Sequence, residues 1–134
     1  MLILDTHIWV WWNQNDPQLS LYQKNTIEEA STQGIGICTI SLVEISRLVQ
    51  RGRIVLPKPT QEWFDIALTQ EGVILISITP EIAIGSVTLP DTFQKDPADR
   101  LIVATARAYD CPLVTADREI LAYPHVKLVP PLPR

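Results

Sequence analysis

Short apolar runs alternate along the chain with longer segments in which apolar residues recur at helical spacing. The runs that predict buried strands are residues 2–4, 35–38, 73–78, 113–115 and 126–129. The segments that predict helices are residues 6–12, 20–33, 41–51, 60–70, 81–87, 97–109 and 117–121. Because no Asn-Gly or Asp-Gly hairpin signal separates the strands, we expect parallel strands joined by crossover helices. The pattern therefore predicts an α/β fold, a three-layer α/β/α sandwich with a central parallel sheet of four to five short strands.

Two of the predicted helices have further local signals. The helix over residues 20–33 is polar on most faces, with a thin apolar stripe that includes Leu21 and Ile27. Ser41 and Glu44 have the spacing of a capping box, which predicts that Ser41 caps a helix beginning there.

Four acids lie where this topology can bring them to one edge of the sheet. Asp5 and Asp117 directly follow predicted strands, whereas Glu44 and Asp99 lie in predicted helices next to the second and fourth strands. In open parallel sheets the carboxyl ends of the strands form the crevice in which ligands bind. Acids that are far apart in the sequence can therefore share one site.

Each acid also has a purely structural explanation. Asp5, Asp96 and Asp117 each precede a predicted helix and can cap it, and Asp99 would lie in a first helical turn, where a negative charge is favourable. Arg100 follows Asp96 by four residues, which predicts an intrahelical ion pair. Capping and metal binding are compatible, because a helix N-terminus helps to keep a carboxylate ionised.

A divalent cation is the usual relief for several carboxylates that share one crevice. Oxygen donors without a His or Cys partner favour Mg²⁺ or Mn²⁺, which can activate a water for phosphodiester hydrolysis. The chain has 11 Lys and Arg against 15 Asp and Glu, a net charge of -4, which argues against nucleic-acid binding through a broad basic surface. Contact with nucleic acid through a bound metal stays open.

The composition predicts a single domain over residues 1–134. A chain of 134 residues, 46% hydrophobic, can bury a sizeable core but is too short for two ordinary domains. No apolar run reaches the ~18 residues of a membrane span. The first residues lack the basic segment and cleavage site of a signal peptide, so we expect a cytoplasmic protein that does not bind membranes. Cys38 and Cys111 are far apart and predict reduced thiols rather than a disulfide or zinc site.

Four sequence blocks resemble the PIN-domain ribonucleases, in particular the VapC toxins of bacterial type II toxin–antitoxin pairs. In order, the blocks are residues 2–7 (LILDTH), 41–45 (SLVEI), 96–106 (DPADRLIVATA) and 113–117 (LVTAD). The resemblance covers nearly the whole chain and implies a PIN-like fold. It implies that the catalytic, metal-binding acids are Asp5, Glu44, Asp99 and Asp117. It also implies supporting hydroxyl groups near these acids, at Thr6, Ser41 and Thr115.

The same resemblance implies a Mg²⁺-dependent endoribonuclease, with Mn²⁺ as an alternative ion. An RNA substrate, a cognate antitoxin that lies over the site and a homodimer are implied as well. Within this set we expect Asp5 and Asp99 to hold the principal ion. Glu44 and Asp117 would complete the site, bind a second ion or orient the water.

Several other residues and functions were weighed against this hypothesis. His7 is expected to be structural or exposed rather than catalytic, and the indoles of Trp9, Trp11 and Trp12 to serve a core or interface rather than RNA stacking. A dinucleotide-binding protein is disfavoured because no G-x-G-x-x-G follows the first strand. A phosphatase or receiver domain is disfavoured because no suitable lysine follows a strand end; the lysines are Lys24, Lys58, Lys95 and Lys127. A catalytically inactive RNA- or protein-binding PIN module, whose acids serve only as caps, stays as the alternative.

Overall fold

The computed structural model of the chain describes residues 1–133 and contains a five-stranded parallel sheet. Its strands are β1 (Leu2–Leu4), β2 (Ile35–Cys38), β3 (Val73–Ile76), β4 (Leu113–Val114) and β5 (Leu128–Val129). They are arranged in the order β3-β2-β1-β4-β5, and every pairing is parallel. The predicted parallel sheet is confirmed, and each strand lies within an apolar run that predicted a strand.

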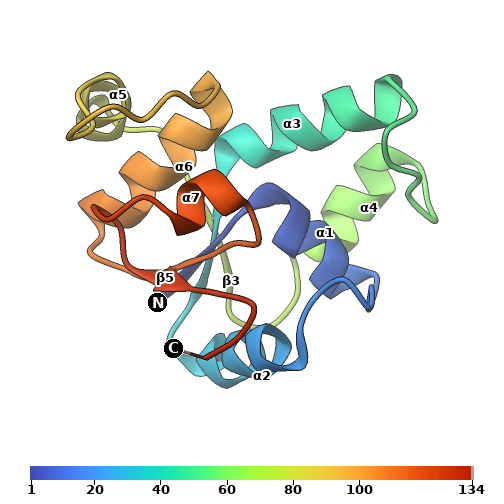
Figure 1. The fold of residues 1–134 in the computed structure, drawn as a ribbon. Coiled ribbons are helices and arrows are strands. Elements are labelled where there is room, and N and C mark those ends of the chain that lie inside the picture. The colour runs from blue at the N-terminus through green and yellow to red at the C-terminus, as the bar shows by residue number, and fades with distance from the viewer. Residues whose placement is uncertain (134) are drawn as a thin grey trace.

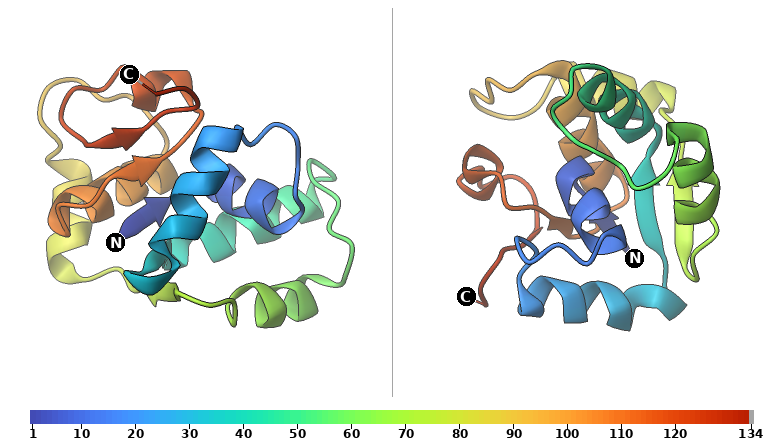
Figure 2. Two further views of the ribbon diagram at one scale, coloured as in Figure 1. Left: turned by 90° about the horizontal axis from the view of Figure 1, so that it is seen from below. Right: turned by 90° about the vertical axis from the view of Figure 1, so that its right-hand side faces the viewer.

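Helices connect the strands and cover both faces of the sheet. They are α1 (Thr6–Asn13), α2 (Leu21–Glu29), the 3₁₀ helix η1 (Ala30–Thr32), α3 (Thr39–Gln50), α4 (Thr60–Ala67), α5 (Pro80–Val87), α6 (Pro97–Ala108) and α7 (Arg118–Leu121). In Figure 1 the sheet lies between α2 below and α5 and α6 above. Both views in Figure 2 place α4 (green) and the C-terminal segment (red) at opposite edges. None of the helices within residues 1–133 is long and apolar enough to cross a membrane.

The sheet divides the apolar core into two clusters. Leu2 and Leu4 contribute to one cluster with side chains of α1 to α4, whereas Ile3 between them contributes to the other with side chains of α5, α6 and α7. This alternation is what successive residues of a strand produce, and it confirms the three-layer α/β/α sandwich. Trp9 of α1 is fully buried in the first cluster, where its ring packs edge-on against Trp63.

The predicted apolar stripe of α2 is wrong at Leu21, which is 72% exposed. Gln23 is fully buried instead, and its Nε2 donates hydrogen bonds to the carbonyls of Thr115 (2.8 Å) and Val129 (2.9 Å). A buried amide is favourable when its polar atoms are paired, and here the pairing joins α2 to the ends of β4 and β5. Cys38 and Cys111 are free thiols, as predicted.

The sheet order brings the ends of β1 and β4 together. Leu4 pairs with Val114, so Asp5 and Thr115 follow directly at the carboxyl ends of two adjacent strands. α3 begins where β2 ends, and α6 packs against α3. The edge of the sheet that was expected to hold the site is therefore formed by β1, β2 and β4 and by the starts of α1, α3, α6 and α7.

Candidate active site

Asp5 lies at the base of the site and is held by two hydrogen bonds. It caps α1: its Oδ1 accepts from the backbone N–H of Thr6 at 2.8 Å. Its Oδ2 accepts from the hydroxyl of Thr115 at 2.7 Å. Asp5 is only 7% exposed, and this burial raises the pKa of its carboxyl although both hydrogen bonds act to lower it. The capping prediction is confirmed, and the carboxylate is fixed in one orientation.

Glu44 projects from α3 and is positioned by hydroxyl groups. The hydroxyl of Thr6 donates to Oε1 of Glu44, and Oγ of Ser41 lies 2.8 Å from Oγ1 of Thr6. Because the single proton of Thr6 goes to Glu44, Ser41 is the donor in the second pair. Burial raises the pKa of Glu44, with the negative charge of Asp5 adding to the effect and the Thr6 hydrogen bond opposing it.

The predicted capping box at Ser41 is wrong. α3 begins two residues earlier, at Thr39, with Cys38 in the N-cap position and no side-chain cap. Ser41 is therefore inside the helix and fully buried, and its hydroxyl faces Thr6. The helix can begin directly after β2, so the Ser41 and Glu44 side chains are available to the site instead of to the helix end.

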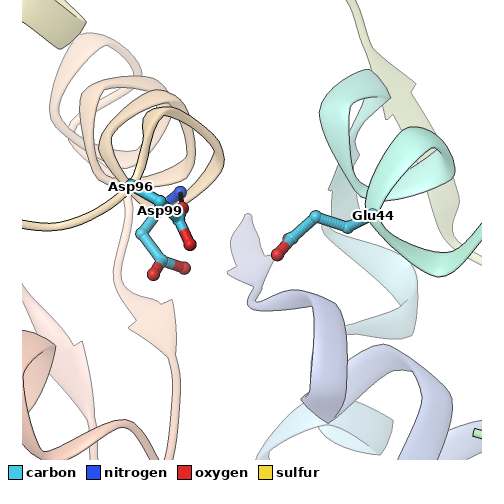
Figure 3. Close-up of side chains that lie close together, drawn as sticks. All are labelled: Glu44, Asp96 and Asp99. Carbon is cyan, nitrogen blue, oxygen red and sulfur yellow. Dashed lines mark hydrogen bonds between the residues drawn. The ribbon is translucent and has the colours of Figure 1, made fainter. Parts of the chain in front are cut away.

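Asp96 and Asp99 come from the start of α6. Asp96 is the N-cap and accepts from the backbone N–H of Asp99 at 3.0 Å, as predicted. Figure 3 shows both carboxylates facing Glu44 across the pocket. Burial, followed by the negative charges of Asp5 and Asp96, raises the pKa of Asp99 to about 7. Asp99 is thus a carboxyl that shares a confined space with other acids.

One carboxylate oxygen from each of Glu44, Asp96 and Asp99 lies within 4.8 Å of the others. Asp96 was expected only to cap the helix, so its place in this group was missed. Its position three residues before Asp99 was the available signal, since the N-cap and the third residue of a helix lie close together. The donors are all carboxylate oxygens, which is the chemistry that Mg²⁺ and Mn²⁺ prefer.

Asp117 completes the acidic set from the start of α7. It caps that helix, with Oδ1 accepting from the backbone N–H groups of Glu119 (2.9 Å) and Ile120 (3.2 Å), as predicted. Its Oδ2 lies 2.9 Å from Nζ of Lys95. Partial burial acts to raise the pKa of Asp117, but the Lys95 hydrogen bond and the helix amides outweigh it and lower the pKa.

Lys95 is a second residue, besides Asp96, that the sequence did not place among the acids. Its Nζ contacts Asp117 and also lies 3.3 Å from Oδ2 of Asp99. Lys95 does not follow a strand end, as expected from the sequence, but it reaches the acids from the segment before α6, a route that the sequence did not indicate. Partial burial alone would lower its pKa, but hydrogen bonding to Asp117 and the charges of both aspartates raise it.

The acids line one pocket of about 380 Å³. Its lining residues are Asp5, His7, Ile8, Trp11, Glu44, Leu48, Asp96, Asp99, Ala116 and Asp117. The structure therefore brings the four predicted acids together and adds Asp96. The Thr6 hydroxyl donates a hydrogen bond to Glu44 and the Thr115 hydroxyl donates one to Asp5, while the Ser41 hydroxyl is hydrogen-bonded to that of Thr6.

The structure also shows the surroundings of Arg100 and Trp11, and the predicted ion pair of Arg100 is wrong. Arg100 does not pair with Asp96; its guanidinium donates to the carbonyls of Ser86 (2.8 Å) and Phe93 instead. Ser86 lies in α5 and Phe93 in the segment between α5 and α6, so Arg100 connects both to α6. Trp11 lines the pocket beside His7, with ring centroids 6.1 Å apart, so one of the three tryptophans of α1 borders the site.

Comparison with known proteins identifies the family. The family model of the PIN domain matches residues 2–126 of this chain. The chain belongs to the PIN domain family. This chain is also 36% identical over 128 residues to ribonuclease VapC22 of Mycobacterium tuberculosis, a match that covers 96% of this chain and 95% of the relative.

Solved structures confirm the PIN-like fold. The VapBC2 structure from Rickettsia felis, bound to a DNA fragment from its promoter, superposes with a TM-score of 0.72 at 21% identity, covering 96% of this chain and 97% of that one. DNA-bound VapBC from Salmonella typhimurium gives a TM-score of 0.71 at 17% identity, with 98% of both chains covered. At these identities the likeness shows the fold alone.

Proposed function

We propose that this PIN domain is a metal-dependent endoribonuclease and the toxin component of a type II toxin–antitoxin pair. One observation carries the proposal: acids from β1, α3, α6 and α7 line a single pocket in which the pKa of Asp99 is raised to about 7. Such an arrangement is unfavourable unless a proton or a cation relieves the repulsion. The ribonuclease name of the 36%-identical relative supports the choice of reaction.

Glu44, Asp96 and Asp99 would hold a Mg²⁺ or Mn²⁺ ion, with Asp5 beside them at the base of the pocket. When bound, such an ion supplies an activated water and stabilises negative charge on phosphodiester oxygens. The donor set fits these ions because it consists of carboxylates in a partly buried site. Asp117 lines the same pocket and already binds the Lys95 ammonium group.

The surrounding residues would fix the acids and shape the pocket. Thr115 and the backbone N–H of Thr6 hold both oxygens of Asp5, while the Thr6 hydroxyl orients Glu44. Ile8, Trp11 and Leu48 form an apolar wall beside the acids and would exclude water from that side of a bound RNA. A pocket held in this way needs little rearrangement when substrate binds.

The proposed partners are RNA as substrate, a cognate antitoxin and a second copy of the chain, all in the cytoplasm. The VapBC complexes among the structural neighbours support the antitoxin. Exposed apolar side chains of α5, Ile84 (63%) and Val87 (73%), are consistent with a homodimer interface. Sedimentation of the purified protein would measure the number of copies.

A catalytically inactive RNA- or protein-binding PIN module is the alternative. It is favoured by the finding that Asp5, Asp96 and Asp117 all cap helices, which gives each of them a structural role. Glu44 and Asp99 cap no helix, and both have raised pKa values in a shared pocket. The metal-dependent nuclease explains all five acids, whereas capping explains three.

Cleavage of a tRNA or total-RNA mixture by the purified protein tests the proposal. We expect cleavage with Mg²⁺ or Mn²⁺, none with EDTA, and none by the Asp5→Asn and Asp99→Asn variants. Asp65→Asn is a matched control, because Asp65 is exposed on α4, away from the pocket, and accepts a hydrogen bond from Gln61 of the same helix. Cleavage that persists in EDTA and in both site variants, or its absence throughout, would instead support the inactive module.

A further inference from the structure

Lys95 holds a positive charge between two of the pocket acids. Its Nζ lies 2.9 Å from Oδ2 of Asp117 and 3.3 Å from Oδ2 of Asp99, and its side chain is only 16% exposed. Asp99 also belongs to the group of three carboxylates that could hold a metal ion. The ammonium group therefore contacts the same carboxylate that a bound divalent ion would use.

The segment that carries Lys95 is anchored on both sides. Phe93 is 6% exposed and packs on the ring of Tyr123 with centroids 4.4 Å apart, and the Tyr123 hydroxyl donates to the carbonyl of Pro90 at 2.6 Å. The guanidinium of Arg100 donates to the carbonyl of Phe93. Immediately after Lys95, Asp96 caps α6. These contacts place Lys95 at the pocket, unlike an exposed lysine that is free to move.

Nucleases that use two metal ions place them ~3.5–4 Å apart around shared oxygen ligands. In this PIN domain Glu44, Asp96 and Asp99 would supply the first position, and the space between Asp99 and Asp117 would be the second. Lys95 already fills that space with one positive charge. A divalent ion there would have to displace the ammonium group from its hydrogen bond with Asp117 and its ion pair with Asp99, and would be repelled if it did not.

We propose that Lys95 takes the place of a second divalent cation, so that the site binds a single metal ion. This inference rests on the proposed function, because it assumes that the acids hold a metal. It assigns Lys95 as a positioning residue: the ammonium balances Asp117 and keeps Asp99 directed toward the first ion. The chemical consequence is that charge near a bound phosphodiester is supplied by one metal and one lysine.

Counting bound Mn²⁺ tests the proposal without relying on activity. Calorimetric titration of the metal-free protein, with free Mn²⁺ measured by electron paramagnetic resonance, gives the stoichiometry. We expect one ion for the native protein and for Lys95→Arg, and two for Lys95→Met, with the first ion bound about tenfold more tightly because a neighbouring positive charge is gone. Lys127→Met is the control, since Lys127 pairs with Asp110 and is 62% exposed.

Two results would overturn the role of Lys95 while leaving the nuclease proposal intact. One is a native protein that binds two Mn²⁺ ions; the other is a folded Lys95→Met variant that still binds one ion with native affinity. If Lys95→Met does not fold, Lys95→Gln, which removes the charge but keeps a polar end, takes its place with the same expected result of two ions. A native protein that binds no Mn²⁺ overturns the proposed metal-dependent function itself and this inference with it.

Discussion

The acidic pocket has two sides that balance negative charge in different ways. On the compensated side, Asp117 is paired with Lys95 and two helix amides, and its pKa is lowered. On the uncompensated side, formed by Asp5, Glu44 and Asp99, burial raises all three pKa values, and the negative charge of Asp5 adds to the effect at Glu44 and Asp99. Lys95 also lies 3.3 Å from Asp99, yet one ammonium does not offset burial together with the charges of Asp5 and Asp96.

This difference indicates where an additional positive charge is needed. Hydroxyl and amide donors orient Asp5 and Glu44 without neutralising them. A divalent ion would supply the missing charge on the uncompensated side, whereas the compensated side is stable without one. The two sides should therefore respond differently to substitution, and this expectation can be tested step by step.

The largest expected difference is in catalysis. Glu44→Gln keeps an oxygen for the Thr6 hydroxyl but removes a charge from the uncompensated side, and we expect a loss of about 10³-fold in cleavage rate, because metal stabilisation of the transition state is worth several kcal/mol. Asp117→Asn, which can still cap α7, should lose only about 10- to 100-fold. Initial rates on one RNA substrate measure both. Equal losses in the two variants would contradict the distinction between the sides.

The second largest expected effect is on stability, and it comes from the hydrogen bond that the Thr115 hydroxyl donates to Asp5. Thr115→Val keeps the shape of the side chain but removes the donor to Asp5 Oδ2 and the acceptor for the N–H of Asp117. Leaving such buried groups unpaired should lower the free energy of unfolding by about 1–3 kcal/mol. Urea unfolding measures it, with Thr115→Ser as the variant that retains the hydroxyl. A valine variant as stable as the serine variant would show that Asp5 does not depend on this contact.

The raised pKa of Asp99 predicts a pH dependence of stability. Between its ordinary value of 3.8 and its folded value of about 7, the folded state holds a proton that the unfolded state has lost. This contribution is therefore fully present below about pH 4 and disappears as the pH rises through about 7.

Comparison with Asp99→Asn isolates this effect from other titrating groups. At pH 8 without metal, the variant should be more stable than the native protein by about 1 kcal/mol, a few degrees in Tm, and the advantage should shrink at pH 5. Millimolar Mg²⁺ should raise the native Tm at pH 8 and leave the variant nearly unchanged. Thermal unfolding at both pH values measures these shifts; a difference between the two proteins that does not vary with pH would contradict the pKa assignment.

The strands, the helices and the predicted acids could be found from the sequence because each leaves a local signal. Asp5 and Asp117 stand between a strand and a helix, at the carboxyl ends of the adjacent parallel strands β1 and β4. Where a local signal had two explanations, the sequence alone did not decide between them. Ser41 and Glu44 fit a capping box, but the helix begins at Thr39, a choice that depends on how α3 leaves β2.

Contacts between distant segments left no such signal. Lys95 reaches Asp117, 22 residues away, only because the packing of Phe93 and the hydrogen bonds of Arg100 fix the path of the segment before α6. Gln23 is buried because two carbonyls at the ends of β4 and β5 accept its amide hydrogens. Both cases are polar side chains whose partners are set by tertiary structure, which hydrophobic periodicity does not describe.

The smallest expected effect concerns the anchor of the compensated side. Tyr123→Phe keeps the ring that packs on Phe93 but removes the hydroxyl that donates to the carbonyl of Pro90. The loss of one partly buried hydrogen bond should lower the free energy of unfolding by about 1 kcal/mol. Tyr109→Phe, at a tyrosine that is 47% exposed, is the control and should change stability little. If the Tyr123 variant also binds a second Mn²⁺ ion, the anchored segment and not Lys95 alone sets the metal stoichiometry; if it is as stable as the control, the hydroxyl does not hold the segment in place.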